Sequence, residues 1–345
     1  MAITYHAGRR IQGTQADFDG TPAVSGGWKE LARTTLGSNG DSIDVSSLAD
    51  KRYLMFLLDS RSNGTAISTT WKANGSTGNE YSFRRNHDGT EGDATTQPSA
   101  ATSWTSIVTN AFGVGYAANK SGKEKLFLEH EVYQNTAGAG TAPTRTKNAF
   151  KWTGTDVIDQ LTMHNSDSGD IVSGSELVVL GYDPDDTHTD NFWEELASVD
   201  STGDQTAVFS SAKKYIWIQV YVEGTSGLNF RMGNTTIDTG SNYSYRNSSN
   251  GGADGTSTSQ TGLWTSFTFD ALPKFYNFFM INNASNEKLI FGHAGTQSTA
   301  GAGNAPNRLE IVGKWTNTSN QADRFQVLAA NGTIGTNIIK VWGSN

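Results

Sequence analysis

This chain of 345 residues has no cysteine, so neither disulfide bonds nor thiolate metal sites contribute to it. It is also poor in charge. Only 17% of its residues are charged, against about a quarter in an average domain, and the net charge is −8. A nucleic-acid-binding face needs clustered Lys and Arg, so this balance argues against nucleic acid as a partner.

Long hydrophobic runs are missing as well. No apolar stretch approaches the ~20 residues that span a bilayer, so we expect no membrane insertion. The first residues lack the charged start and apolar core of a secretory signal. A cysteine-free chain with an uncharged polar exterior and no such signal fits a virion component that is assembled in the host cytoplasm. The alternative is a cytoplasmic protein with an unusual surface.

What the chain does contain is a repeat. Residues 124–152 and 287–315 align without a gap, and 15 of the 29 positions are identical. Weaker matches keep the same order on both sides, such as Trp28–Ala32 with Trp193–Ala197. The chain is therefore interpreted as a duplicated unit. We expect an N-terminal arm over residues 1–25, a first domain over 26–186 and a second over 190–345.

The repeated segments have the pattern of β-strands. Residues 215–222 alternate in polarity with a period of two, and residues 53–58 form a short apolar run. Clusters of Gly, Asn, Ser and Thr separate such runs. The short Trp-x-Glu-Leu-Ala segments are either helical or the first strand of each sheet. Many short strands predict an all-β chain of two tandem antiparallel, jelly-roll-like β-sandwiches.

Each copy has the same order of segments. Trp-x-Glu-Leu-Ala precedes a Ser/Asp-rich strand, a Tyr-led apolar strand, a Gly/Asn-rich turn and a Tyr-Ser-aromatic-Arg segment. This order resembles the β-sandwich modules of tailed-phage fibre, spike and capsid-decoration proteins, and residues 1–13 resemble structural proteins of environmental viruses. The resemblance covers residues 26–345. It implies a virion setting without choosing between capsid and tail.

We therefore predict a virion structural protein that acts through assembly contacts and surface adhesion. Its expected partners are other virion proteins and further copies of the chain, as a homo-oligomer. The alternative is a module that binds carbohydrate or a host receptor, with a host-surface glycan as partner. A third reading is a polysaccharide-cleaving spike, which needs two nearby carboxylates. The sequence has no recognised catalytic motif, so we expect no enzyme.

The best-matched feature of the repeat is a loop of small residues. It runs over residues 135–145 and again over 298–308, and its repeated positions are Gly138, Gly140, Pro143, Arg145, Gly301, Gly303, Pro306 and Arg308. The glycines allow positive φ and close backbone approach. The loop lacks the Gly-Lys-Ser/Thr ending of a phosphate loop, so a nucleotide role is not favoured. We interpret it as a compact structural loop, with a subunit-contact or ligand loop as the alternative.

Three further features are candidates for binding. Four carboxylates lie between the copies and are weak candidates for Ca²⁺, although their spacing does not match an EF-hand: Asp183, Asp185, Asp186 and Asp190. A solvated linker is the simpler reading, and we expect no other cofactor. His130 and His293 occupy equivalent positions and are interpreted as hydrogen-bonded structural residues. The arm has no second copy, and its anchoring residues are predicted to be Tyr5, Arg9, Arg10 and Phe18.

Overall fold

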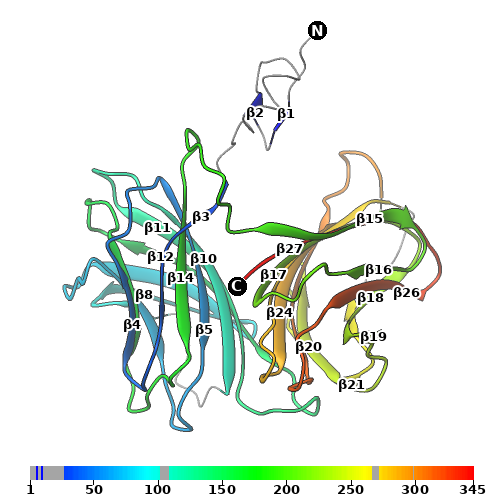
Figure 1. Cartoon of the computed structure of the whole chain (residues 1–345), viewed down its shortest axis with the longest axis horizontal. Helices are drawn as coiled ribbons and strands as arrows, with labels where there is room; N and C mark the ends of the chain where they lie inside the picture. The colour runs from blue at the N-terminus through cyan, green and yellow to red at the C-terminus, as the bar shows by residue number, and fades with distance from the viewer. Residues whose placement is uncertain (1–4, 7–8, 11–26, 102–108, 266–271, 298) are drawn as a thin grey trace.

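The computed structural model of the chain describes residues 5–6, 9–10, 27–101, 109–265, 272–297 and 299–345. Throughout these residues the regular secondary structure is β-strand, and all strand pairs are antiparallel. This confirms the predicted fold class of two tandem antiparallel β-sandwiches (Figure 1). No helix in the described part of the chain has the length and hydrophobicity to cross a bilayer.

The first sandwich joins an eight-stranded sheet to a four-stranded sheet. The larger sheet has the order β3-β14-β5-β10-β11-β12-β7-β8, with bounds Lys29–Thr35, Glu176–Tyr182, Tyr53–Ser60, Asn110–Ala118, Lys125–Gln134, Thr144–Trp152, Tyr81–His87 and Thr90–Gln97. The smaller sheet has the order β4-β13-β6-β9, with bounds Ser42–Ser46, Gln160–Asn165, Thr69–Ala73 and Ala100–Ala101.

The second sandwich repeats this plan. Its eight-stranded sheet has the order β15-β27-β17-β23-β24-β25-β20-β21, with bounds Glu194–Thr202, Ile334–Ser344, Tyr215–Gly224, Lys274–Ile281, Lys288–Thr296, Asn307–Trp315, Tyr243–Ser249 and Gly255–Gln260. Its smaller sheet contains β16, β26, β18 and β19, with β22 paired to β18, and their bounds are Gln205–Val208, Arg324–Asn331, Gly227–Asn234, Thr236–Ile237 and Leu263–Thr265.

The Trp-x-Glu-Leu-Ala segments are strands. β3 and β15 begin directly after Trp28 and Trp193, and each forms one edge of its eight-stranded sheet. A β-bulge interrupts the pairing of both strands, after Val179 in the first sheet and near Leu196 in the second. The strand interpretation of these segments is therefore confirmed.

Each sandwich has its own core, formed where the larger sheet covers the smaller one. In the first sandwich Phe56 packs on Trp71, with ring centroids 4.6 Å apart. In the second, Phe230 packs on Phe278 at 5.0 Å. Trp71 and Tyr276 are both buried, and each belongs to the core of its own sandwich.

The repeated Glu-Lys-Leu and Lys-Trp sequences form a buried lysine cage. The Lys125 ammonium donates to the carbonyls of Lys120, Lys123 and Thr155, and lies 6.0 Å from the Trp152 ring centroid. Lys288 repeats this arrangement against Trp315 at 5.8 Å, and burial lowers its pKa to about 8. Each cage holds the loop before a central strand without a disulfide.

The described part of the arm is a short hairpin. β1, Tyr5–His6, pairs with β2, Arg9–Arg10, in the register Tyr5↔Arg10 and His6↔Arg9. It lies apart from both sandwiches (Figure 1). Phe18 lies outside the described residues, so the anchoring role of the arm stays a prediction.

Candidate functional site: the joint between the sandwiches and an open groove

The outer face of each eight-stranded sheet, which points away from the smaller sheet, carries the candidate site. Side chains alternate between the two faces of a strand. On β11, Phe127 points into the core, whereas Leu126, Leu128, His130 and Val132 lie on the outer face. The outer face of the first sheet is apolar along most of its length, so a large part of it must be covered.

The second sandwich covers one half of that face. A single apolar cluster crosses from one sandwich to the other and includes Leu57, Val114 and Val178 from the first and Ile281 and Leu289 from the second. Phe112 lies at its centre, with its ring centroid 6.2 Å from Tyr215 and 5.6 Å from Phe291. We call this contact the joint. Because its apolar side chains are fully buried, the joint fixes one sandwich against the other.

The small-residue loop of the first copy forms the rim of the joint. We call Thr136–Thr144 the docking loop. The second sandwich holds it almost entirely through the loop's backbone. The carbonyls of Thr136, Ala139, Thr141 and Pro143 accept from Lys314, the Ser259 amide, Ser244 and Arg246, and the Gly138 amide donates to Glu287. Gly138 has φ +86°, a conformation that glycine adopts without strain.

Arg145 follows the docking loop directly and forms buried ion pairs across the joint. Its guanidinium contacts Asp254 at 2.5 Å and Glu310, and all three side chains are buried. Lys147 also pairs with Glu310. Burial alone would raise the pKa of Glu310, but Lys147 and Arg145 hold it below the usual value, so this carboxylate stays ionised.

Two smaller polar groups complete the joint. Lys214 of the second sandwich lies 3.0 Å from both Asp59 and Glu176 of the first, and the Tyr215 hydroxyl donates to Glu176 at 2.8 Å. Across the docking-loop rim, Arg246 lies 3.0 Å from Asp88. Ion pairs therefore border the apolar cluster on more than one side.

The equivalent histidines meet in the joint. The ring centroids of His130 and His293 are 4.2 Å apart, with the rings edge to face. Burial lowers the pKa of His293 to about 4, with Lys147 and Arg145 adding to the shift. Burial, and then His293 itself, places the pKa of His130 well below its ordinary value. Both rings are therefore neutral near pH 7.

The two sandwiches meet head to tail rather than symmetrically. Under a two-fold relation, the contacts of Phe112 with Tyr215 and Phe291 would recur between Phe275 and the counterparts Tyr53 and Leu128. These three side chains are instead exposed, by 47%, 42% and 60%. Likewise Arg145 is buried, whereas its counterpart Arg308 has 59% of its side chain exposed. Such an interface is heterologous: it joins two different surfaces of the same unit.

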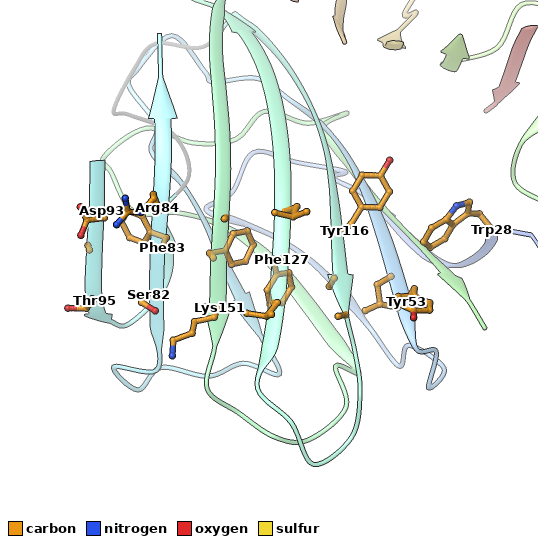
Figure 2. A pocket seen from close by; sticks show the side chains of 18 residues that line it. Trp28, Tyr53, Ser82, Phe83, Arg84, Asp93, Thr95, Tyr116, Phe127 and Lys151 are labelled. Atoms are coloured by element: carbon orange, nitrogen blue, oxygen red, sulfur yellow. The ribbon is translucent and has the colours of Figure 1, made fainter. Parts of the chain in front are cut away.

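The uncovered half of the first outer face forms an open groove of about 710 Å³. Trp28, Tyr53 and Tyr116 lie at one end, and the Trp28 ring centroid is 6.2 Å from that of Tyr116 (Figure 2). Leu126 and Leu128 line its middle and are 62% and 60% exposed. The other end is polar and includes Ser82, Arg84, Asp93, Thr95 and Lys151 (Figure 2). We call this feature the apolar groove.

The predicted site residues fall into different environments. Gly138, Pro143 and Arg145 contact the second sandwich, and Gly140 lies exposed within the docking loop. Gly301, Gly303, Pro306 and Arg308 are all exposed. Asp183 and Asp186 pair with Lys51, and Asp190 lies 2.9 Å from Lys29. The described residues contain no group of three or more His, Asp or Glu placed to hold a metal ion. Calcium binding near Asp185 stays a prediction.

Sequence reasoning missed the apolar groove. Leu126 and Leu128 lie in an ordinary strand pattern, and nothing local distinguishes them from the buried counterparts Leu289 and Phe291. A usable signal is Trp28, which the sequence places only at the start of a short segment that is either helical or a first strand. Its position just before an edge strand places an aromatic ring at the border of the outer face.

Comparisons with known proteins add little to this geometry. No family model and no curated protein matches the chain. Among solved structures, domains LG4-5 of the mouse laminin alpha1 chain align at 12% identity over 92% of this chain and 89% of that one, with a TM-score of 0.21. The LG1-3 region of the laminin alpha2 chain aligns at 8% identity over 88% and 64%, also at 0.21. A TM-score of 0.21 is too low for either similarity to support a conclusion about this chain.

Arg145 and Arg308 provide a matched pair for testing the joint. Arg145→Ala should lower the free energy of unfolding by about 3 kcal/mol or more, because it removes the buried guanidinium that pairs with both Asp254 and Glu310. Arg308→Ala, at the equivalent exposed position, should change it by less than about 1 kcal/mol. Urea unfolding of both variants measures the difference. Equal effects would contradict the assignment of Arg145 to a buried joint.

The histidine pair predicts acid sensitivity. The unfolded chain takes up protons below the ordinary histidine pKa of 6.5, whereas folded His293 does so only near about 4. Stability present above pH 6.5 should therefore be lost as the pH falls through this window, by at most about 1.4 kcal/mol per pH unit for each histidine. His130→Asn combined with His293→Asn should make the loss between about pH 7 and about pH 5 shallower.

Urea unfolding at the two pH values measures that slope. His87, whose pKa burial also lowers to about 4, remains in both proteins and gives the same background. An identical slope in the wild type and the double variant would show that the pair is not the origin of the acid sensitivity.

Proposed function

We propose that the protein is a non-catalytic structural and adhesive component of a virion surface, of the decoration or fibre type. The observation that carries this proposal is the joint. A duplicated unit whose copies meet through complementary, non-equivalent surfaces suits a protein that works by assembly. The segment order that resembles phage fibre and decoration modules supports the virion setting.

The exterior of the molecule supports the same role. Its low charge and its Gly-, Ser-, Thr- and Asn-rich turns present an uncharged polar surface. The joint holds the two sandwiches together through a buried apolar cluster and ion pairs, so contacts made by one sandwich constrain the other. Rigid modules held in this way reinforce an assembly and present their loops outward.

Localisation tests the proposal directly. Gold-labelled antibody raised against residues 26–345 should decorate intact virus particles recovered from the biological source of this chain, in electron micrographs. Pre-adsorption of the antibody with the purified protein should remove the label and serves as the control. Protein found only in the fraction without particles would refute the virion role.

A carbohydrate-binding or receptor-binding role is the second candidate, and the apolar groove favours it. A groove with aromatic rings at one end and polar side chains at the other suits the apolar and hydroxyl faces of an extended sugar chain. Trp28, Tyr53 and Tyr116 supply the rings, and Arg84 and Asp93 supply polar groups. This role is compatible with a virion setting, where surface modules contact host glycans.

A glycan array measures this candidate. If the groove binds sugar, the wild type should bind a defined set of glycans, and Tyr116→Ala should reduce that binding at least about tenfold through loss of a stacking ring. Val208→Ala, at an exposed apolar residue of the other sandwich, is the control and should bind as the wild type does. Equal binding by wild type and Tyr116→Ala would place any glycan site elsewhere.

A further inference from the structure

The docking loop occurs twice, but its two copies have different surroundings. Thr136–Thr144 is held by the second sandwich, as described above. The counterpart Thr299–Asn307 keeps the same small residues, including Gly301, Gly303 and Pro306, yet almost all of it is exposed. Pro143 is buried, whereas Pro306 is exposed. The second loop therefore has the shape for docking without a partner surface within the chain.

The surface that holds the docking loop also occurs twice. Five groups of the second sandwich bind the loop, namely Glu287, Lys314, Ser244, Arg246 and the Ser259 amide. The strand registers place the same chemistry at equivalent positions of the first sandwich, namely Glu124, Lys151, Ser82, Arg84 and Thr96. The backbone conformation is also the same at this position, since Thr96 and Ser259 both lie at a β-bulge and have φ values of +56° and +51°.

These equivalent groups differ in exposure. Lys314 and Glu287 form a buried pair, with 0% and 5% of their side chains exposed. Lys151 and Glu124 form the same pair at 3.2 Å, with 42% and 51% exposed. The apolar residues of the two surfaces differ in the same way. Leu289 and Phe291 are buried, whereas their counterparts Leu126 and Leu128 are exposed. The apolar groove is thus an unfilled copy of the surface that the docking loop fills in the second sandwich.

We propose that the apolar groove of one chain receives the Thr299–Asn307 loop of a second copy of the same chain. By equivalence with the joint, Lys151, Ser82 and Arg84 donate to backbone carbonyls of the loop, and Glu124 accepts from the Gly301 amide. Leu126 and Leu128 are covered by the incoming outer face, where the exposed Phe275 occupies the position of Phe112.

This contact repeats from chain to chain. In the joint, the docking loop of the first sandwich lies against the surface of the second sandwich that is equivalent to the apolar groove. In the proposed contact, the Thr299–Asn307 loop of the second sandwich lies in the apolar groove of the next chain. A heterologous contact of this kind generates a ring if its rotation closes and a filament if it does not. The inference rests on the proposed structural function and names the partner through which it acts.

The contact between chains is weaker than the joint. The strand registers place Gln219, Asn277 and Lys340 where the joint has Leu57, Val114 and Val178. The second outer face is therefore more polar. Among the ion-pair partners of Arg145, Asp254 has an acidic counterpart in Glu91, but Glu310 corresponds to Lys147. Self-association is accordingly reversible and rises with protein concentration.

Sedimentation velocity of the full chain over a concentration series tests the proposal. The wild type should shift from monomer to larger species as the concentration rises. Leu128→Arg, at an exposed groove position, should raise the dissociation constant at least about tenfold, because it places a charge in an apolar contact. Val208→Arg, at an apolar residue with 55% exposure outside both surfaces, should associate as the wild type does.

Engineered cysteines locate the contact. The chain has no cysteine of its own, so single-cysteine variants report one position each. Within the joint, the Ser259 amide donates to the Ala139 carbonyl at 2.8 Å. A chain carrying both Ala139→Cys and Ser259→Cys should therefore form an internal disulfide and serves as the positive control. The equivalent intermolecular pair is Ala302→Cys in one chain and Thr96→Cys in another.

Mixing those two single variants under mild oxidation should give a disulfide-linked heterodimer in preference to either homodimer. Oligomers that are weakened by Leu128→Arg, together with this heterodimer, support the proposal. A monomer at every concentration, an unchanged oligomer in Leu128→Arg, or the absence of the heterodimer beside a working positive control overturns it. Particle labelling is unaffected by any of these outcomes, so a failure here is distinct from a failure of the virion role.

Discussion

An eight-stranded sheet that is apolar on both faces must be covered twice. In the first sandwich the smaller sheet covers one face, and Leu57, Val114 and Val178 make half of the other face equally apolar. Water contact with those side chains is costly, so the second sandwich must lie where it does. The position of the docking loop, the burial of Arg145 and the meeting of the two histidines all follow from that one requirement.

The features that the sequence predicts well are decided by local structure instead. Strand periodicity, turn composition and the repeat itself report local structure, and they gave the all-β sandwich class correctly. The repeat also singles out the Gly/Ala/Pro loop, whose first copy forms the rim of the joint. Each of these properties is decided by residues that are neighbours in the chain.

The joint and the apolar groove could not be predicted from the sequence. Both depend on which of two equivalent residues, one in each copy, is buried by the other sandwich. Arg145 and Arg308 have the same neighbours in sequence, yet one is buried among carboxylates and the other is exposed. Leu126 and Leu289 differ in the same way. The sequence places His130 and His293 at equivalent positions, but equivalence in a repeat does not by itself indicate that the two rings are in contact. Only the relative placement of the two sheets decides these cases.

The docking loop is recognised through its backbone carbonyls and one glycine amide. Its side chains contribute mainly by being small enough to permit that approach. Such recognition depends on shape and hardly on side-chain chemistry. Thr141 and Thr144 can therefore become Asn304 and Asn307 in the other copy without altering the groups that are recognised. The loop can thus vary at such polar positions while its glycine, alanine and proline residues are kept, and these kept residues supply part of the identity between the two copies.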